Sequence, residues 1–346
     1  MHEDDYDLIS NKKTSEEENI IQNDNSKNKK EIKEDQLINT FFEFEEEIGH
    51  GSESIVKKGV DKKYGKNYAI KKIKLKNEGE RNENEYKILH KLKNRNIINY
   101  YSILEDKENQ TDYIIMEYIQ FGNLKNFMNK VIKKNYFSES LLCFINYHIL
   151  NSLKYCHACH VCHFDLKPQN ILIDEYLNIK LIDFSVSLDY NKIKSNEIEL
   201  PFCGTSLFMA PEVLKRHIIN VKDINKVDLF SLGIILYNLA FEEFPFGLTH
   251  EDIKKYDIIY DKINNNPLEF DNEDNFYSSY FIDFLRQLLE KDINKRINLN
   301  KALENYWVKG AQILFDEKEK LFNASLFLSY LMCDQLKNFN DYLNKN

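Results

Sequence analysis

The chain has 346 residues, of which 42% are hydrophobic, so it is long enough to bury the core of one large domain or of two lobes. Its formal net charge of −9 argues against nonspecific binding to nucleic acid, and we expect no nucleic-acid partner. No uninterrupted apolar run of roughly 18 residues is present, so we expect no membrane span.

The N-terminal part of the chain differs in composition from the rest. Its first residues, MHEDDYDLIS, have neither a basic stretch nor an apolar one, so no secretory signal is predicted. The six cysteines are therefore expected to be reduced thiols, and we expect a cytoplasmic protein, with the nucleus as the alternative. Residues 1–39 are rich in Glu, Asp, Asn, Lys and Ser and poor in apolar residues, which predicts a disordered acidic tail.

A small lobe rich in β-structure is predicted for residues 40–119. Apolar and polar residues alternate in three segments that predict strands: 41–61, which holds two antiparallel strands around a glycine turn, 66–75, and 111–119. Between them, residues 82–93 carry four apolar side chains at helical spacing, which predicts one main helix.

A larger and mostly helical lobe is predicted for residues 120–310. Its predicted helices and short strands are 140–157, 227–241 and 281–291 for the helices, and 170–174 and 179–183 for the strands. The fold class expected is α+β with two lobes, and a cleft between two lobes is a common ligand site. Residues 311–346 predict one or two amphipathic helices that pack on the large lobe, with a role in binding a regulatory partner as the alternative.

The stretch YCHACHVCHFD, residues 155–165, allows three interpretations. It holds two overlapping Cys-x-x-Cys-His patterns of haem attachment, and its cysteines and histidines could also bind zinc. Nothing directs the chain to a haem-attaching compartment, and no second Cys-x-x-Cys pair exists to complete a zinc site. The third interpretation, which we favour, uses only His163 and the Phe-Asp that follows it.

Two features of the small lobe predict contact with phosphate. Gly49 and Gly51 lie in the turn between the first two strands, and glycines let backbone amides approach a phosphate closely. A strand follows this turn, whereas a dinucleotide-binding fingerprint would open a helix. Lys71 ends the strand YAIK, and at an inward-facing position it would need a counter-charge, which Glu85 on the next helix could supply.

In the large lobe, carboxylate and amide side chains gather around the two short strands. Asp165, Asn170 and Asp183 flank these strands in the sequence. Such hard oxygen ligands suit Mg²⁺, which favours one or two carboxylates together with phosphates and water. A remaining carboxylate could accept the proton of a hydroxyl group.

With these motifs in this order, the chain resembles the eukaryotic protein kinase family over roughly residues 41–310. The matching residues are Gly49, Gly51 and Val56 in the glycine-rich loop; Ala69, Lys71 and Glu85; Asp165, Lys167 and Asn170 in the catalytic loop; Asp183; Ala210, Pro211 and Glu212; Asp228; and Arg296. The resemblance implies the bilobal kinase fold, with ATP in the cleft, and an Arg296–Glu212 pair. Lys167 and the Gly204-Thr205 pair resemble the serine/threonine subclass, which implies transfer of the γ-phosphate of ATP to Ser or Thr hydroxyls of protein substrates.

The resemblance also implies roles for individual residues. Catalysis would rest on Asp165, Lys167, Lys71 and Glu85. The ATP site would comprise Ile48, Gly49, Gly51, Ser52, Val56, Ala69, Lys71, the gatekeeper Met116, the hinge residues Glu117 and Ile119, Leu172 and Asp183. Asn170 and Asp183 would hold Mg²⁺.

Two departures from the family pattern bear on regulation. Phe164 stands where many kinases have an Arg that binds an activation-loop phosphate, and Pro201 lies near the position usually phosphorylated. We therefore expect activity that does not depend on activation-loop phosphorylation. Ser185 replaces the Gly of the Asp-Phe-Gly motif, and its Cβ restricts the backbone rotations that glycine allows.

Two alternative functions stay open at this point. A pseudokinase scaffold would bind partners without catalysis, but Lys71, Asp165, Asn170 and Asp183 are all present, which favours an enzyme. A kinase of small metabolites is disfavoured by the peptide-docking segment at residues 204–212. The positions that select arginine in substrates are uncharged, so we expect no strong preference for arginine; they are Asn123, Gln169 and Asn238.

Overall fold

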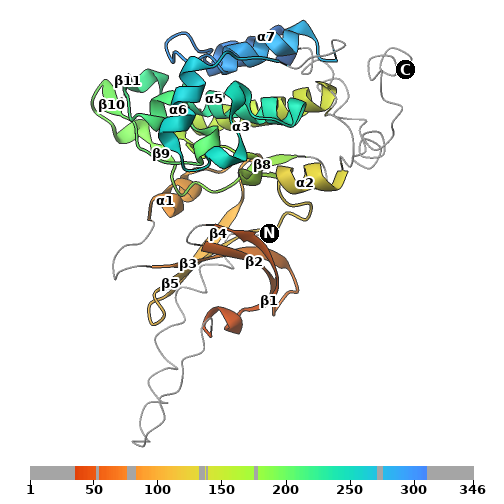
Figure 1. The fold of residues 1–346 in the computed structure, drawn as a ribbon. Coiled ribbons are helices and arrows are strands. Elements are labelled where there is room, and N and C mark those ends of the chain that lie inside the picture. The colour runs from red at the N-terminus through yellow and green to blue at the C-terminus, as the bar shows by residue number, and fades with distance from the viewer. Residues whose placement is uncertain are drawn as a thin grey trace, which may run out of the picture. The chain divides into compact units, whose positions relative to one another are not determined.

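The computed structural model describes residues 36–51, 54–75, 83–131, 137, 139–174, 178–270 and 276–309 (Figure 1). Most of the predicted N-terminal tail, the C-terminal extension 311–346 and Ser52 lie outside these residues. The chain divides into two compact units. The first unit comprises Met1–Arg81 and Asn99–Tyr118, and the second comprises Asn82–Ile98 and Ile119–Asn346.

The strands are β1 (Phe42–His50), β2 (Ser54–Asp61), β3 (Asn67–Lys74), β4 (Tyr100–Asp106), β5 (Thr111–Glu117), β6 (Val161–Cys162), β7 (Ile171–Ile173), β8 (Ile179–Leu181), β9 (Leu188–Asp189), β10 (Glu197–Glu199) and β11 (Ile218–Asn220). The helices are α1 (Glu83–Lys91), α2 (Leu124–Val131), α3 (Glu139–Ala158), α4 (Pro211–Leu214), α5 (Lys226–Phe241), α6 (Tyr256–Asn265), α7 (Ser279–Leu288) and α8 (Leu299–Glu304). A small antiparallel unit and a larger helical one confirm the α+β class predicted from the sequence.

The first unit is built on a five-stranded sheet in the order β1-β2-β3-β5-β4. All its strand pairs are antiparallel, as the hairpin-forming segments predict. Side chains alternate between the two faces, so the register decides which residues share a face. In β3 and β5, Tyr68 and Ile70 face one side, whereas Ala69 and Lys71 face the other.

A hydrophobic core covers one face of this sheet. It comprises Ile38, Phe42, Tyr68, Ile70, Tyr113 and Ile115. Ile38 reaches the core from a 3-10 turn, Ile38–Thr40, and is 0% exposed. Lys62 fastens this turn to the β2–β3 connection, because its Nζ donates to the carbonyl of Asn39 and its backbone N–H to that of Phe41. The ordered core therefore begins two residues before the predicted start of the small lobe.

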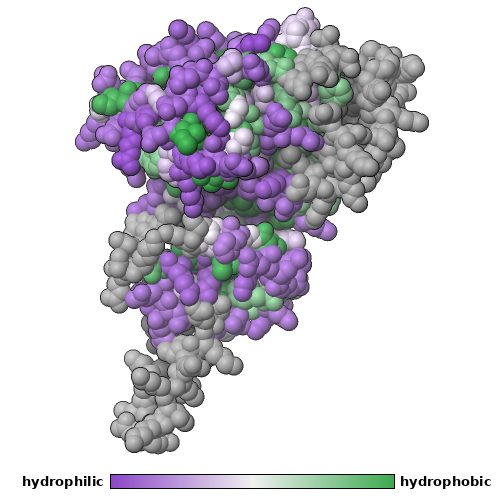
Figure 2. All heavy atoms as spheres, viewed as in Figure 1, coloured by the Kyte–Doolittle hydropathy of each residue, from purple (hydrophilic) through white to green (hydrophobic). Residues whose placement is uncertain are grey.

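The second unit is a layered helical assembly. Helix α5 packs against α3 on one side and α7 on the other (Figure 1). The stretch Val221–Phe241 is long and apolar enough to cross a bilayer, but 83% of it is buried inside the unit. Its apolar character is thus explained by its position in the core, and we found no other such helix in the described residues. Figure 2 shows that the drawn surface of this unit is mostly hydrophilic, with isolated hydrophobic spots.

Helix α1 groups with the second unit, although the sequence analysis assigned it to the small lobe. The Nδ2 of Asn84 donates to the carbonyl of Ser187 at 2.8 Å. Lys91 forms an ion pair with Asp189 at 3.0 Å. Both partners lie in or next to β9, so α1 is attached to the segment that follows β8.

Candidate active site

Asp165 is the centre of a hydrogen-bonded network in the second unit. Its Oδ2 accepts from Lys167 Nζ at 2.6 Å and from Asn170 Nδ2 at 3.0 Å. Its Oδ1 accepts from the hydroxyl of Thr205 at 2.7 Å, and that hydroxyl also accepts from Lys167 Nζ at 2.8 Å. The carboxylate is buried, ionically paired and held in one orientation by three side chains. Such a group can receive a hydrogen bond from a substrate hydroxyl in a defined geometry.

His163 positions the backbone that carries this carboxylate. Its Nε2 lies 3.0 Å from the carbonyl of Ile182, and its Nδ1 lies 3.2 Å from the backbone N–H of Asp165. These contacts assign the proton to Nε2, which donates, and leave Nδ1 to accept. Ser187 adds a hydrogen bond to the His163 carbonyl at 2.9 Å. His163 therefore connects the loop of Asp165 to the segment that follows β8.

Asp228 of α5 anchors the same loop from the core. Its oxygens accept the backbone N–H groups of His163 at 2.9 Å and Phe164 at 3.0 Å. They also contact His157 Nε2 at 2.9 Å and Cys162 Sγ at 3.3 Å. Burial alone would raise the pKa of Asp228, but the hydrogen bonds and charge of the histidines and the backbone donors lower its pKa below the usual value. The ionised carboxylate thus satisfies a loop that would otherwise bury unpaired donors.

The same cluster decides between the interpretations of residues 155–165. The side chains of His157, Cys162 and Asp228 place three metal-ligand atoms within 4.8 Å of one another. Burial raises the pKa of the Cys156 and Cys162 thiols well above the usual value, which opposes the thiolate form that a metal requires. Hydrogen bonds among the three groups account for their proximity. Cys159 is the partly exposed thiol of this stretch, as the sequence analysis expected.

Asn170 and Asp183 offer oxygen ligands at the end of a short hairpin. The pairing of Ile171 with Leu181 brings the residues that flank β7 and β8 together. The Nδ2 of Asn170 donates to the Asp165 carbonyl at 2.8 Å, which leaves its Oδ1 on the opposite side of the amide. Asp183 adopts a left-handed backbone with φ of 63°. An amide oxygen and a carboxylate form a donor set that fits Mg²⁺.

In the first unit, four of the predicted ATP-site residues lie on one face of the sheet. Lys71 in β3 is paired with Val56 in β2 and Ile114 in β5. Ala69 is paired with Met116 two positions along the same strands. All of these side chains are buried or partly buried. The face opposite the hydrophobic core therefore presents one lysine among apolar groups, which suits an aromatic ring attached to a phosphate chain.

The predicted glycine-rich loop lies at the β1–β2 connection. Ile48 and Gly49 belong to β1, and the backbone N–H of Gly51 donates to the carbonyl of Ser54 at 2.7 Å. The hydrogen bond closes the turn across residues 51–54. Ser52 lies outside the described residues.

The remaining predicted residues lie in both units. Glu117 ends β5, and its Oε1 accepts the backbone N–H of Asn99 at 2.7 Å. Ile119 and Leu172 belong to the second unit, where Leu172 in β7 is bridged to Asn123. Glu85 is buried in α1 of the second unit, whereas Lys71 belongs to the first. The Lys71–Glu85 pair stays a prediction.

A family model for the protein kinase domain matches residues 42–308 of this chain. The chain belongs to the protein kinase family. Members of this family use ATP with a divalent cation. The C-terminal extension that follows Lys309 lies beyond the match.

Curated relatives of this kinase domain have serine/threonine kinase names. Mouse "Serine/threonine-protein kinase 33" is 29% identical over 287 residues, 79% of this chain and 56% of that protein. "Probable serine/threonine-protein kinase fhkA" of Dictyostelium discoideum is 31% identical over 313 residues, 81% of this chain and 51% of that protein. Human "Death-associated protein kinase 2" is 31% identical over 291 residues, 79% of this chain and 73% of that protein. The chain spans about half the length of the first two relatives.

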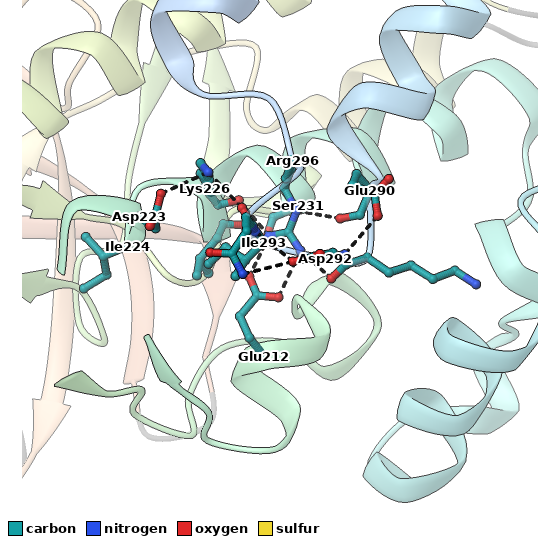
Figure 3. Close-up of polar contacts among 12 residues, drawn as sticks. Glu212, Asp223, Ile224, Lys226, Ser231, Glu290, Asp292, Ile293 and Arg296 are labelled. Atoms are coloured by element: carbon teal, nitrogen blue, oxygen red, sulfur yellow. Dashed lines mark hydrogen bonds and ion pairs between the residues drawn. The ribbon is translucent and has the colours of Figure 1, made fainter. Parts of the chain in front are cut away.

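The predicted Arg296–Glu212 pair of the kinase domain is confirmed (Figure 3). Arg296 Nη1 and Nη2 donate to the two carboxylate oxygens of Glu212 at 2.6 and 2.9 Å. The remaining N–H groups donate to the backbone carbonyls of Glu290, Lys226 and Lys291. The guanidinium, only 2% exposed, also lies over the Phe230 ring at 4.8 Å. All five donors of this buried cation are satisfied.

Backbone pairing holds the kinase activation segment, residues 183–212. Strand β9 pairs with β6 at its start, and β10 pairs with β11 in its middle. Two further hydrogen bonds extend the second ladder, from Leu200 N–H to the His217 carbonyl and from Val221 N–H to the Asn196 carbonyl. Phe164 is buried, and Ser185 does not adopt a left-handed φ, so its Cβ causes no strain.

Thr205 is the site residue that the sequence analysis did not assign. It lies 40 positions after Asp165, yet its hydroxyl contacts both Asp165 and Lys167. The signal was the Gly-Thr pair before Ala-Pro-Glu, which we used only to assign the subclass.

Proposed function

We propose that this kinase domain is an active, ATP- and Mg²⁺-dependent protein serine/threonine kinase. The observation that carries the proposal is the buried Asp165 carboxylate, oriented by Lys167, Asn170 and Thr205. A scaffold without catalysis has no need for an aligned carboxylate beside a lysine and two oxygen ligands. The serine/threonine kinase names of the relatives support a protein substrate.

In the proposed reaction, Asp165 orients the substrate hydroxyl and accepts its proton. The hydroxyl oxygen forms a bond to the γ-phosphorus while the bond from that phosphorus to the β–γ bridging oxygen breaks, and ADP leaves. Lys167, which lies 2.6 Å from Asp165 Oδ2, lies near the γ-phosphate and offsets the charge that develops there. Thr205 keeps both side chains in place.

The other predicted residues hold the nucleotide. Lys71, supported by Glu85, holds the α- and β-phosphates, and the glycine-rich loop covers them through Gly49, Gly51 and Ser52. The adenine lies against apolar side chains and the hinge backbone, namely Ile48, Val56, Ala69, Met116, Glu117, Ile119 and Leu172. Asn170 and Asp183 hold Mg²⁺, which when bound neutralises charge on the phosphate oxygens.

A substitution at Asp165 tests this proposal. We expect Asp165→Asn to lower the rate of phosphate transfer to a protein substrate by about 10²- to 10⁴-fold, because the proton acceptor is lost. Asp257→Asn is the matched control, since this aspartate pairs with Lys215 at the surface and should leave the rate unchanged. If unaltered protein and Asp165→Asn turned over ATP equally slowly, the scaffold alternative would replace the enzyme.

We further propose that activity does not require phosphorylation of the activation segment. Phe164 is buried and apolar, so it offers no cation to a phosphate, and Pro201 has no hydroxyl to modify. The β10–β11 ladder and Thr205 supply the order that a phosphate provides elsewhere. Phosphatase-treated protein, verified by mass spectrometry, should keep its kcat/KM within about twofold. A loss of activity that an upstream kinase restored would refute this.

Substrate selection should lack a strong arginine preference. Asn123 Oδ1 accepts the Asn126 N–H, and Asn238 Nδ2 donates to the Glu243 carbonyl, so both amides act in local structure. With Gln169 they replace acidic groups by uncharged ones. A positional peptide library should therefore show no dominant arginine position, and strong arginine selection would refute this.

A further inference from the structure

Three exposed aromatic residues gather where the described chain ends. Tyr280, in the first turn of α7, and Tyr306, just after α8, have ring centroids 4.9 Å apart. They are 56% and 72% exposed, and Phe276, two residues before the N-cap of α7, is 57% exposed. Only four other large hydrophobic residues are as exposed in the described parts of the chain, and they lie elsewhere in the sequence. We call Phe276, Tyr280 and Tyr306 the aromatic platform.

The platform is attached to a rigid base. Trp307, next to Tyr306, is buried and packs on Phe281 at 4.9 Å between ring centroids. Its Nε1 donates to Glu139 Oε1 at 2.8 Å. The same carboxylate accepts from the backbone N–H of Ser278, which is the N-cap of α7. The aromatic rings thus stand on a base tied to three helices, and their exposure does not arise from a loosely held loop.

We propose that the chain's own segment 311–333 covers the aromatic platform. The described residues end at Lys309, three positions after Tyr306, so the segment starts next to the rings. Its sequence, AQILFDEKEKLFNASLFLSYLMC, repeats leucine at seven-residue spacing in Leu314, Leu321 and Leu328. Such spacing places these side chains along one face of a helix, while the run DEKEK falls largely on other faces.

The tether makes this occupant more favourable than a second chain. A short connection gives the attached segment an effective concentration on the order of millimolar at the platform. Weak apolar contacts therefore suffice to keep the segment bound, whereas a separate partner would need to reach the same occupancy from solution. Covering three exposed aromatic rings removes apolar surface from water at about 25 cal/mol per Å².

Photo-cross-linking of the full-length chain tests the proposal. We would place benzoylphenylalanine at position 306 and, as the control, at the equally exposed Tyr64 of the first unit. The expected result is an intrachain cross-link from position 306 to a peptide within residues 311–333, and none of this kind from position 64. Mixing isotopically labelled and unlabelled protein separates intrachain from interchain products.

Substitutions in the segment provide the matched comparison. Replacing Leu314, Leu321 and Leu328 by serine should lower the cross-link yield at least about fivefold, while replacing Lys318 and Lys320 by serine should leave it unchanged. Products that join two copies, products with any other part of the chain, or the absence of products would each overturn the proposal. Because the readout does not depend on phosphate transfer, it is separate from the tests of catalysis.

Discussion

Gly204 lies directly against the backbone carbonyl of Phe164. It adopts a φ of +100°, and a Cβ added there would overlap the Phe164 oxygen and lie 3.6 Å from Asp165 Oδ1. The activation segment can therefore approach the catalytic loop closely only because residue 204 has no side chain. This close approach brings the neighbouring Thr205 within hydrogen-bonding distance of Asp165.

Gly204→Ala should consequently impair both activity and stability. We expect at least about a tenfold loss of kcat and a decrease of about 1–3 kcal/mol in the free energy of unfolding, from backbone strain and overlap. Urea denaturation and steady-state kinetics measure the two effects. Gly65→Ala is the matched control, because Gly65 also has a positive φ, +67°, but faces open space. Equal losses in the two variants would contradict the assigned contact.

Removal of the Arg296 guanidinium should strongly destabilise the second unit. Arg296→Met leaves the buried Glu212 carboxylate without its partner, and breaking such a pair typically costs about 3–5 kcal/mol. The neighbouring Lys295→Met serves as control, because its contact with Asp292 is long, 3.6 Å, and largely exposed. Denaturant unfolding should separate the two variants clearly. A loss below about 1 kcal/mol in Arg296→Met would show that Glu212 finds another donor.

His148 should make stability depend on pH. Burial chiefly, and the nearby charge of Arg95, lower the pKa of His148 to about 4, while Asp174 acts in the opposite direction. The unfolded chain binds a proton at His148 near pH 6.5, so between about pH 6.5 and 4 it binds more protons than the folded chain. The stability contributed by neutral His148 is thus complete at pH 7 and is lost as the pH falls through this window.

Comparison with His148→Gln isolates this effect. The difference in unfolding free energy between the unaltered protein and the variant should shift by about 2 kcal/mol between pH 7 and pH 4.5, against the unaltered protein at low pH. Adding Arg95→Met should reduce the shift, since the repulsion by that charge is removed. A difference that stays flat over this pH range would mean that His148 is well hydrated in the folded protein.

The N-terminal turn should be needed for the stability of the first unit. Ile38→Ala removes a fully buried side chain from the core on one sheet face and should cost about 2–4 kcal/mol. Tyr64→Ala, on the exposed β2–β3 turn, should cost about 0.5 kcal/mol or less. Hydrogen exchange of the β3 and β5 amides measures both. Equal protection in the two variants would remove Ile38 from the core.

The sequence predicted best where the signal was local. Strong periodicity gave the β1–β2 hairpin and the helices α3, α5 and α7, and motif order predicted the Arg296–Glu212 pair. Strand β4 was not predicted, because its residues are nearly all half-buried and alternate weakly. Strands β10 and β11 have three residues each, too few for a period to appear. The contact of Thr205 with Asp165 depends on how the chain folds back, which no local pattern encodes.

The β10–β11 ladder has a topological consequence for the activation segment. It joins the two ends of residues 201–217, which carry Thr205 and Glu212, into a closed loop. Closing that loop removes most of the conformational entropy that its opening would otherwise release. The exposed stretch at Lys192 and Lys194 lies outside the loop. A protease cut there would leave the loop closed, and the two fragments would still share the ladder.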